Sequence, residues 1–313
     1  MAEPNPDAFI FTGQGPQEVG MGAELAATHP EAQEAFDEAD TAVIPLIGRK
    51  ISELCFEGPK AELDRNTQIA MFTIAAATLA VLQRKGKMPK AVAGHSVGEY
   101  GALLAAGVFG AGAVAVQKGV RVMFERQEAM READLNIPGG GGMGAIKGLS
   151  EAELLALAKK FDIDIAAANI PDEYTISGVN DSVEAAVTEA DSREGVKAVM
   201  LNIKGAAHSR WQGIAADRML PVLRDALTDN PKLTFFANNA RELTSRVEIV
   251  THLGNMFTGT VRFYEMSQEM LRSGVRSFAE PSHANTLSKI LKRGFGSRVK
   301  MVPLKKLIGG ADK

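Results

Sequence analysis

The chain has 313 residues, 45% hydrophobic and 23% charged, which is ordinary for a globular protein with one large domain or two unequal ones. Its net charge of −3 and a pI near 6.0, without aromatic residues interleaved among basic ones, argue against a nucleic-acid partner. The longest apolar stretch, residues 71–82, is too short to span a membrane, and the N-terminus lacks the basic and apolar regions of an export signal, so we expect a cytoplasmic protein.

Cys55 is the single cysteine, so no intramolecular disulfide can form, and its apolar neighbours predict a small buried side chain. The histidines and the cysteine show no zinc-type spacing, and the chain has no phosphate-binding loop of the Walker type. We therefore expect neither a metal nor a cofactor.

The first 132 residues predict strands and helices in alternation. An apolar strand over residues 8–12 ends at the loop Gly13-Gln14-Gly15-Pro16. The elements expected after that loop are helices at 30–41, 60–65 and 68–85, a strand at 91–93, a helix beginning at 99 and a long helix from about 111 to 132.

Pro138 and the four glycines after it mark a boundary, beyond which the pattern changes. The expected order is strand, helix, strand, strand, helix, strand, over residues 143–149, 150–160, 163–168, 174–179, 182–193 and 196–203. Ser150 and Glu153 form a capping box at the start of the first of these helices. The order is that of a ferredoxin-like domain, and a further short strand at 234–237 indicates that the larger domain resumes afterwards.

The segment Gly94-His95-Ser96-Val97-Gly98 joins the strand at 91–93 to the helix at 99 and places a serine in a sharp turn. Glycines on both sides remove the Cβ atoms that would crowd such a turn. The positive end of the following helix points toward the serine. A G-x-S-x-G pattern alone is a weak signal, but this strand–turn–helix context makes Ser96 a candidate nucleophile.

A serine nucleophile needs a base, and the five histidines are His29, His95, His208, His252 and His283. We expect His29 and His252 at the surface. His95 adjoins the serine and points elsewhere, which favours a structural role. His208 follows a turn of small residues, in a loop from which an imidazole can project into a cleft, and is the candidate base.

Taken together, the motifs resemble those of malonyl-CoA:acyl-carrier-protein transacylases and the acyltransferase domains of polyketide synthases, from Phe9 to about Leu304. The segments that carry the resemblance are Phe11–Gly15 (F-P-G-Q-G in the family), Gly94–Tyr100 (G-H-S-x-G-E-Y), Arg121, which lies 25 residues after Ser96, Asn169–Pro171 with Ile176–Gly178 (N-S-P…I-S-G), and Ala207–Ser209, the histidine motif. Five motifs in this order are far more specific than any one of them.

The resemblance implies an α/β fold in which a large α/β-hydrolase-like domain, residues 1–130 and 206–313, carries an inserted ferredoxin-like (βαββαβ) domain, residues 131–205. It implies an acyltransferase that moves a malonyl group from coenzyme A to the phosphopantetheine thiol of an acyl carrier protein, in fatty-acid or polyketide synthesis. Ser96 would form the acyl-serine intermediate and His208 would take its proton.

Other site residues follow from the same resemblance. The backbone N–H groups of Gln14 and Val97 would hold the oxyanion. Arg121 would bind the malonyl carboxylate in a bidentate manner; the alternative is an arginine paired with an acidic residue across the helix surface. The backbone carbonyl that orients the histidine would belong to Met256 or, with a one-residue gap, to Asn255.

Several positions depart from the family pattern. Thr12 stands where the family has proline, and Ser282-His283 replaces a Gly-Pro pair, so we do not expect His283 to be catalytic. Ala207 is smaller than the residue that usually precedes the histidine. Transfer of a substituted malonyl or other acyl unit therefore stays an alternative.

Two further functions remain open. One is a trans-acting acyl hydrolase of the same fold, although the acidic residues that follow Ser96 at a suitable distance fall in the inserted domain, which is a poor place for a third triad member. The other is a silent module that binds a carrier protein, against which the intact Ser96, His208 and Arg121 argue.

Charge is spread unevenly along the chain. Residues 286–313 carry a net charge of +7, and the remainder carries −10. This basic segment suits an acidic carrier protein as a transient partner, or else forms an ordinary solvated surface. We expect a monomer.

Overall fold

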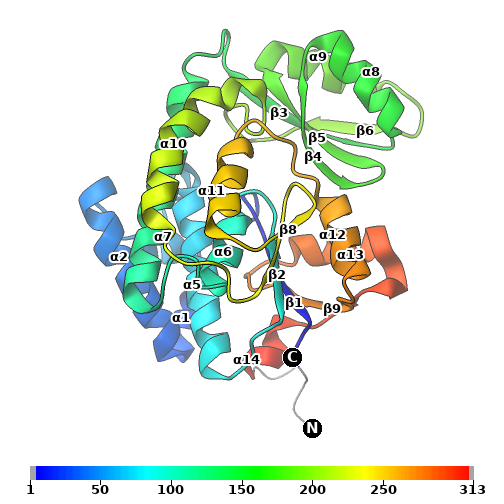
Figure 1. The fold of residues 1–313 in the computed structure, drawn as a ribbon. Helices are drawn as coiled ribbons and strands as arrows, with labels where there is room; N and C mark the ends of the chain where they lie inside the picture. Colours follow the sequence, from blue (N-terminus) through cyan, green and yellow to red (C-terminus); the bar gives the residue numbers. More distant parts are fainter. Residues whose placement is uncertain (1–4, 310–313) are drawn as a thin grey trace.

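The computed structural model describes residues 5–309 and contains two β-sheets (Figure 1). Asp312 and Lys313 of the basic segment lie outside the described residues. The larger sheet has the strand order β10-β9-β1-β2-β7-β8. In chain order its strands are β1 (Ala8–Phe11), β2 (Ala91–Gly94), β7 (Thr234–Ala237), β8 (Arg241–Leu243), β9 (Ser277–Ala279) and β10 (Lys300–Met301). Every pair in it is parallel except β7 with β8.

Strands β1 and β2 are buried along their whole length, as expected of parallel strands covered on both faces. Alternate residues serve the two faces: Phe9 and Phe11 belong to one apolar cluster, Ala8 and Ile10 to another. The helices that pack on the first face include α2 (Pro30–Ile47), α5 (Thr67–Arg84), α6 (Gly98–Ala105), α7 (Gly112–Asp134), α10 (Gly213–Ala226) and α11 (Arg246–Asn255). Those on the second face are α12 (Phe263–Arg272) and α13 (Thr286–Phe295).

The remaining helices of this part are short. They are α1 (Ala23–Thr28), α3 (Ile51–Phe56), α4 (Lys60–Arg65), α14 (Leu304–Ile308) and the 3₁₀ turns η1 (Arg210–Gln212) and η2 (Gly296–Arg298). Cys55 of α3 is buried, as expected, and burial raises the pKa of its thiol.

The smaller sheet is antiparallel, with the order β4-β5-β3-β6. Its elements are β3 (Gly141–Lys147), α8 (Glu151–Phe161), β4 (Asp164–Ile170), β5 (Glu173–Val179), α9 (Asn180–Asp191) and β6 (Lys197–Met200). Both helices pack on one face of it around a separate apolar cluster. The predicted ferredoxin-like arrangement is confirmed, as is the capping box of Ser150 and Glu153.

Strand β4 joins the smaller sheet to the larger part of the molecule. Ala167 forms a parallel bridge with Val261, just before α12, and Thr260 donates a hydrogen bond to the Ile165 carbonyl at 2.7 Å. The domain limits at 130/131 and 205/206 stay a prediction. Helix α7, which packs on α2, α5 and α10, continues past the first limit to Asp134.

All strands and helices expected from the sequence are present, with different ends. The helix expected at 30–41 continues to Ile47 and stops at Gly48, whose φ of 72° is the left-handed conformation of a helix C-cap. The strand expected at 196–203 is shorter, because its pairing with β3 runs only from Lys197 to Met200.

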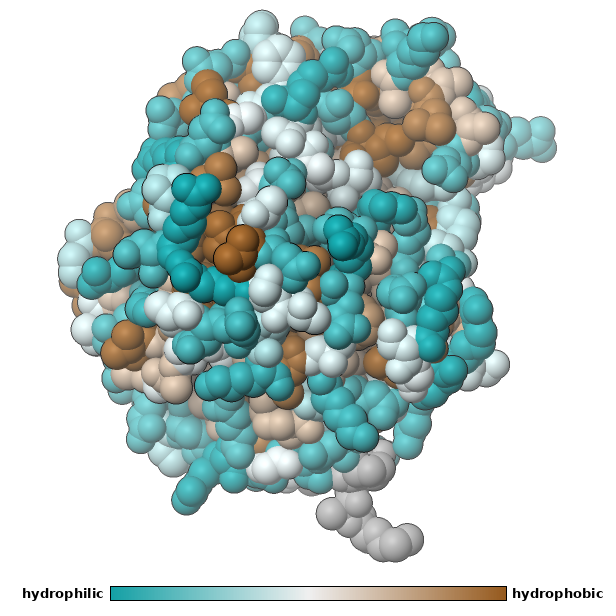
Figure 2. Space-filling view, viewed as in Figure 1, coloured by the Kyte–Doolittle hydropathy of each residue, from teal (hydrophilic) through white to brown (hydrophobic). Residues whose placement is uncertain are grey.

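Within residues 5–309 no helix combines the length and apolarity that a membrane span requires. Nor does the described part contain three or more His, Cys, Asp or Glu side chains grouped as metal ligands. Figure 2 shows a face on which hydrophilic residues predominate, with apolar residues gathered in separate groups.

Candidate active site

Ser96 occupies a strained turn between β2 and α6. Its φ of 52° is left-handed, a conformation that a residue with a side chain rarely adopts. A Cβ on Gly94 would lie 2.1 Å from the Gly98 carbonyl carbon, and one on Gly98 would lie 2.0 Å from the Phe11 carbonyl oxygen. Neither position accepts any other residue, so the two glycines let the turn close while the serine projects from the carboxyl end of the sheet.

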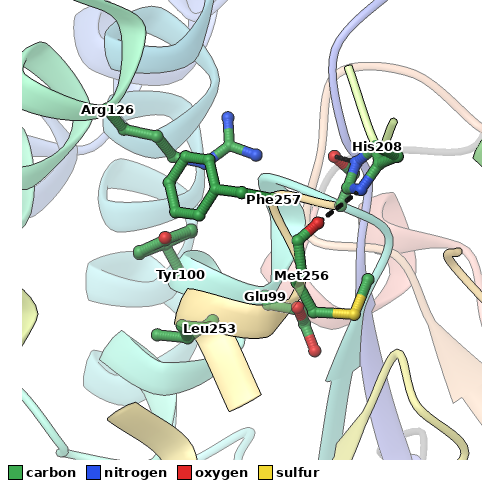
Figure 3. Close-up of a pocket in the computed structure, with 8 residues that line it drawn as sticks. Glu99, Tyr100, Arg126, His208, Leu253, Met256 and Phe257 are labelled. Carbon is green, nitrogen blue, oxygen red and sulfur yellow. Dashed lines mark hydrogen bonds between the residues drawn. The ribbon is translucent and has the colours of Figure 1, made fainter. Parts of the chain in front are cut away.

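The side chain of His208 meets that of Ser96. The Nε2 atom lies 2.6 Å from Ser96 Oγ. The Nδ1 atom lies 2.8 Å from the Met256 carbonyl (Figure 3) and 3.2 Å from the Gly259 carbonyl. Carbonyl oxygens only accept, so the proton sits on Nδ1, and the Nε2 lone pair accepts from the serine hydroxyl. This is the geometry of a base that activates a nucleophile.

Of the two residues named for orienting this histidine, Met256 supplies the carbonyl. Asn255 has no hydrogen bond to His208 in the described structure. Sequence reasoning missed the second acceptor, Gly259, because a carbonyl carries no side-chain signal.

The loop that carries His208 is anchored by Asp134 at the end of α7. One carboxylate oxygen of Asp134 accepts from Ala206 N–H at 3.0 Å and from Gln212 Nε2 at 2.8 Å. Burial raises the pKa of Asp134, although both hydrogen bonds favour its ionised form. A Cβ on Gly205 would lie 2.0 Å from the same carboxylate, so a glycine is needed beside it. Sequence reasoning did not identify Asp134.

Arg126 of α7 lines the pocket with Ser96 and His208. Its side chain is buried, 5% exposed, and Nη1 donates to Gln68 Oε1 at 2.6 Å. The guanidinium lies 5.7 Å from the ring centre of Tyr100 and 5.2 Å from that of Phe257. Figure 3 shows it turned toward the side of the pocket where His208 lies.

No carboxylate among the described residues lies within 4.0 Å of this guanidinium. A buried cation without a counter-ion is costly, so the pocket is electrostatically suited to an anionic group. The cation also acts on the base: burial, and then Arg126, lower the pKa of His208 to about 3. The imidazole is therefore neutral at neutral pH.

The prediction that Arg121 is the site arginine is wrong. Arg121 is exposed and does not line the pocket. Five residues along an α-helix correspond to about 500° of rotation, which turns Arg121 about 140° away from Arg126. The number of residues after Ser96 does not say which arginine of the helix faces the pocket. A sequence signal for Arg126 was the polar Gln68 within the otherwise apolar helix α5, since a buried amide needs a partner.

A buried polar network supports the turn from below. Ser96 N–H donates to Asn238 Oδ1 at 2.7 Å, and Asn238 N–H donates to Glu99 Oε1 at 2.8 Å. The same Glu99 oxygen lies 2.8 Å from His252 Nε2. The expectation of a surface position for His252 is wrong, because its side chain is only 4% exposed. Glu248, one helical turn before His252 in α11, is exposed, whereas the histidine is turned toward Glu99 beneath the elbow.

His95, next to the nucleophile, takes the structural role expected of it. Its Nε2 lies 2.9 Å from Asn169 Oδ1 on β4, which ties the elbow to the smaller sheet. Burial lowers the pKa of this imidazole.

The two backbone N–H groups predicted to hold the oxyanion belong to Val97 and Gln14. Val97 caps the N-terminus of α6, and Gln14 is exposed in the loop that follows β1, the neighbour of β2. Neither N–H donates a hydrogen bond within residues 5–309. Gly13 packs so closely on the elbow that a Cβ there would lie 2.6 Å from the His95 carbonyl oxygen.

The family model described as "Acyl transferase domain" matches residues 8–312. The malonyl CoA-acyl carrier protein transacylase of Bacillus subtilis is 33% identical over 295 residues, which cover 91% of this chain and 89% of that protein. Among solved structures, the malonyl CoA-acyl carrier protein transacylase of Coxiella burnetii is 30% identical, with a TM-score of 0.89 over 98% of this chain and 97% of its own. A malonyl-transacylase solved in complex with a type II polyketide synthase acyl-carrier protein is 28% identical, with a TM-score of 0.88 over 97% and 98% of the two chains.

Proposed function

This chain belongs to the acyl transferase domain family, and from that premise we propose that it transfers a malonyl group from coenzyme A to the phosphopantetheine thiol of an acyl carrier protein. The observation that carries the proposal is the buried, unpaired guanidinium of Arg126 in the pocket of Ser96 and His208. A plain esterase has no use for such a cation. A malonyl thioester carries a free carboxylate that a planar guanidinium binds in a bidentate manner.

The first half of the reaction acylates the enzyme. Ser96 Oγ attacks the thioester carbonyl while His208 Nε2 takes its proton. The N–H groups of Val97 and Gln14 bind the tetrahedral oxyanion. Loss of one such donor lowers the rate of a serine enzyme by about 10²–10³-fold. As the carbon–sulfur bond breaks, His208 returns the proton to the leaving coenzyme A thiolate.

The second half runs the same steps with a different thiol. The phosphopantetheine thiol of the carrier protein gives its proton to His208 and attacks the acyl-serine carbonyl. The carbon–oxygen bond to Ser96 breaks, and His208 returns the proton to the serine. The two halves together exchange one thiol for another on the malonyl group. The Met256 and Gly259 carbonyls hold the imidazole of His208 through both halves.

The substrate carboxylate also acts on the base. In the free enzyme, Arg126 is the second cause, after burial, of the low pKa of His208. A malonyl carboxylate bound to Arg126 offsets that positive charge. The pKa of His208 therefore rises when malonyl-CoA binds, and the imidazole becomes a stronger base in the complex than in the free enzyme.

In this proposal the acidic carrier protein docks on the basic C-terminal part of the chain. Lys289 and Lys292 of α13 are exposed and have no acidic partner within the described residues, whereas Arg293 is paired with Glu173 at 2.6 Å. Charges of this kind raise the rate of encounter with a partner of opposite sign. A monomeric, cytoplasmic enzyme remains part of the proposal.

Labelled malonyl-CoA tests the proposed function. The purified protein is incubated with malonyl-CoA labelled in the malonyl group, separated from free label, and then mixed with holo acyl carrier protein. We expect a stable labelled protein that passes its label to the carrier. Rapid loss of the label to water favours the hydrolase, and the absence of any label favours a silent binding module. A parallel incubation with methylmalonyl-CoA measures tolerance of a substituent at C2.

A further inference from the structure

We propose that His283 is a positioning residue that holds the loop Gly13–Pro16 so that the Gln14 N–H reaches the oxyanion. The inference rests on the proposed function and names a residue that the reaction scheme above does not use. His283 lies between β9 and α13, far from Pro16 in sequence. Its Nε2 lies 2.8 Å from the Pro16 carbonyl oxygen, although the two partners are 267 positions apart in the sequence.

The parallel sheet brings these two segments together. Strand β9 pairs with β1, and β1 pairs with β2, all in the same direction. The loops that follow the three strands therefore leave the same edge of the sheet. They carry His283, Gln14 and Ser96 in that order across the edge.

The hydrogen bond fixes which nitrogen of His283 carries the proton. A carbonyl oxygen only accepts, so Nε2 must donate. The Nδ1 atom is buried and has no partner among the described residues, so a proton there would be a buried donor without an acceptor. The imidazole is thus held as the tautomer that binds Pro16.

The segment that carries His283 is itself rigidly anchored. The buried carboxylate of Glu280 accepts from Leu287 N–H at 3.1 Å and from Ser288 N–H and Oγ at 2.8 and 2.7 Å. These bonds tie the segment to the first turn of α13. His283 therefore reaches the loop from a fixed support, which a positioning role requires.

Among the residues that the structure describes, the loop has few other attachments. Gly13 packs against the elbow, and Gly15 N–H donates to Gln17 Oε1 at 2.8 Å. Gln17 in turn bonds Asp64 at 3.0 Å, but that pair is exposed. An oxyanion donor acts only from about 2.7–3.1 Å, so a small displacement of Gln14 removes most of its effect. Loss of the His283 bond leaves the loop with the elbow contact and an exposed link.

Two variants distinguish the effect of the hydrogen-bond donor of His283 from the effect of its side-chain size. His283→Gln keeps an N–H donor at the end of a side chain of similar reach, and His283→Met keeps the size and loses the donor. His29→Met is the control, since His29 precedes α2 as its N-cap and, within the described part of the chain, its side chain is paired only with Glu31, at 4.0 Å. Thermal unfolding of all three variants checks that each is folded.

Two readouts apply to each variant. Hydrogen exchange of the Gly15 amide, which donates to Gln17 Oε1, reports the loop itself without any reaction. The saturating rate of Ser96 acylation is measured with malonyl-CoA and, separately, with p-nitrophenyl acetate, which needs the oxyanion donors but not Arg126. We expect His283→Met to exchange faster in the loop and to lose about 10–100-fold in acylation rate with both reagents, at an unchanged half-saturating malonyl-CoA concentration. His283→Gln and His29→Met should stay close to the wild type.

The proposal is overturned by unaltered loop exchange in His283→Met, by an unaltered rate with p-nitrophenyl acetate, or by equal losses in the Gln and Met variants. Failure of the proposed function has a different signature: the wild type then reacts with p-nitrophenyl acetate but not with malonyl-CoA. In that case loop exchange and the ester reaction still decide the role of His283.

Discussion

Arg126 and Arg121 lie on the same helix, α7, but only Arg126 directs its guanidinium into the pocket of Ser96 and His208. The guanidinium is held by the Gln68 amide and the rings of Tyr100 and Phe257, and no carboxylate of residues 5–309 lies within 4.0 Å of it. A buried charge without a partner in the protein is neutralised by an oppositely charged group of the ligand. The pair of arginines therefore supplies both a test of substrate choice and its matched control.

Replacement of Arg126 by alanine should lower kcat/KM for malonyl-CoA by about 100-fold or more, since charge-assisted hydrogen bonds of ~1.5–3 kcal/mol each are lost. The same change should leave acylation by acetyl-CoA equal or faster. Arg121→Ala should behave as the wild type with both substrates. Stopped-flow detection of released coenzyme A measures each rate. Equal losses with malonyl-CoA and acetyl-CoA would remove Arg126 from carboxylate recognition.

The pH dependence of acylation should depend on the substrate. Only the neutral imidazole of His208 accepts the serine proton, so the rate falls as pH drops through its pKa in the enzyme–substrate complex. The carboxylate of malonyl-CoA offsets the positive charge of Arg126, whereas acetyl-CoA has no such group. The pKa of His208 should therefore be higher with malonyl-CoA, and the acid limb of kcat should lie at higher pH. Identical limbs for the two substrates would contradict the proposed charge compensation.

The same low pKa links His208 to folding. Between about 3 and 6.5 the folded protein leaves His208 neutral while the unfolded chain binds the proton. Its contribution to the free energy of unfolding is therefore complete above pH 6.5 and decreases as the pH falls toward 3. Denaturant unfolding at several pH values should show a shallower decrease for His208→Gln than for the wild type. Parallel curves would mean that the imidazole titrates normally in the folded protein.

The elbow glycines predict a large effect on stability. Gly98→Ala places a Cβ 2.0 Å from the Phe11 carbonyl oxygen, so β1 and α6 must separate or the turn must open. We expect a loss of several kcal/mol, as for other overpacked buried sites, and no acylation. Gly213→Ala is the control, because Gly213 begins the helix α10 and, apart from its chain neighbours and its own helix, no atom of the described residues lies within 4 Å of its added Cβ. Differential scanning calorimetry compares the two, and equal melting temperatures would contradict the packing described for the elbow.

The basic surface of α13 predicts an effect on the carrier protein alone. Lys289→Glu with Lys292→Glu should raise the KM for the carrier several-fold, more so at low ionic strength, and leave acylation by malonyl-CoA unchanged. Lys50→Glu with Lys159→Glu makes the same change of charge on exposed residues of other elements. A carrier KM that responds equally to both pairs would point to net charge rather than to a docking surface.

Most of the fold could be predicted from the sequence because its signals are local. Apolar runs bounded by glycine or proline gave the strands, and the order of strands and helices after Pro138 defined the ferredoxin-like part. The motif around Ser96 was equally readable, since two glycines and a serine at fixed spacing describe one turn. His208 followed from the need for a base and from the small residues before it.

The sequence could not predict which way a side chain faces on its helix, or whether that side chain is buried. Arg121 and Arg126 are both arginines on one predicted helix, and only the packing of α7 decides which one faces inward. His252 lies among charged residues, yet its side chain turns toward Glu99. Asp134 and Gly259 act through contacts with segments more than 50 residues away, which no local pattern reveals.

The central claim is that Ser96, activated by His208, carries the acyl group. Peptide mass spectrometry after brief incubation with malonyl-CoA tests it most directly. We predict a malonyl ester on the peptide that contains Ser96, its absence in Ser96→Ala, and acylation slowed by at least about 10³-fold in His208→Ala. A malonyl group on any other residue, or acylation of the His208→Ala variant at the wild-type rate, would contradict this account.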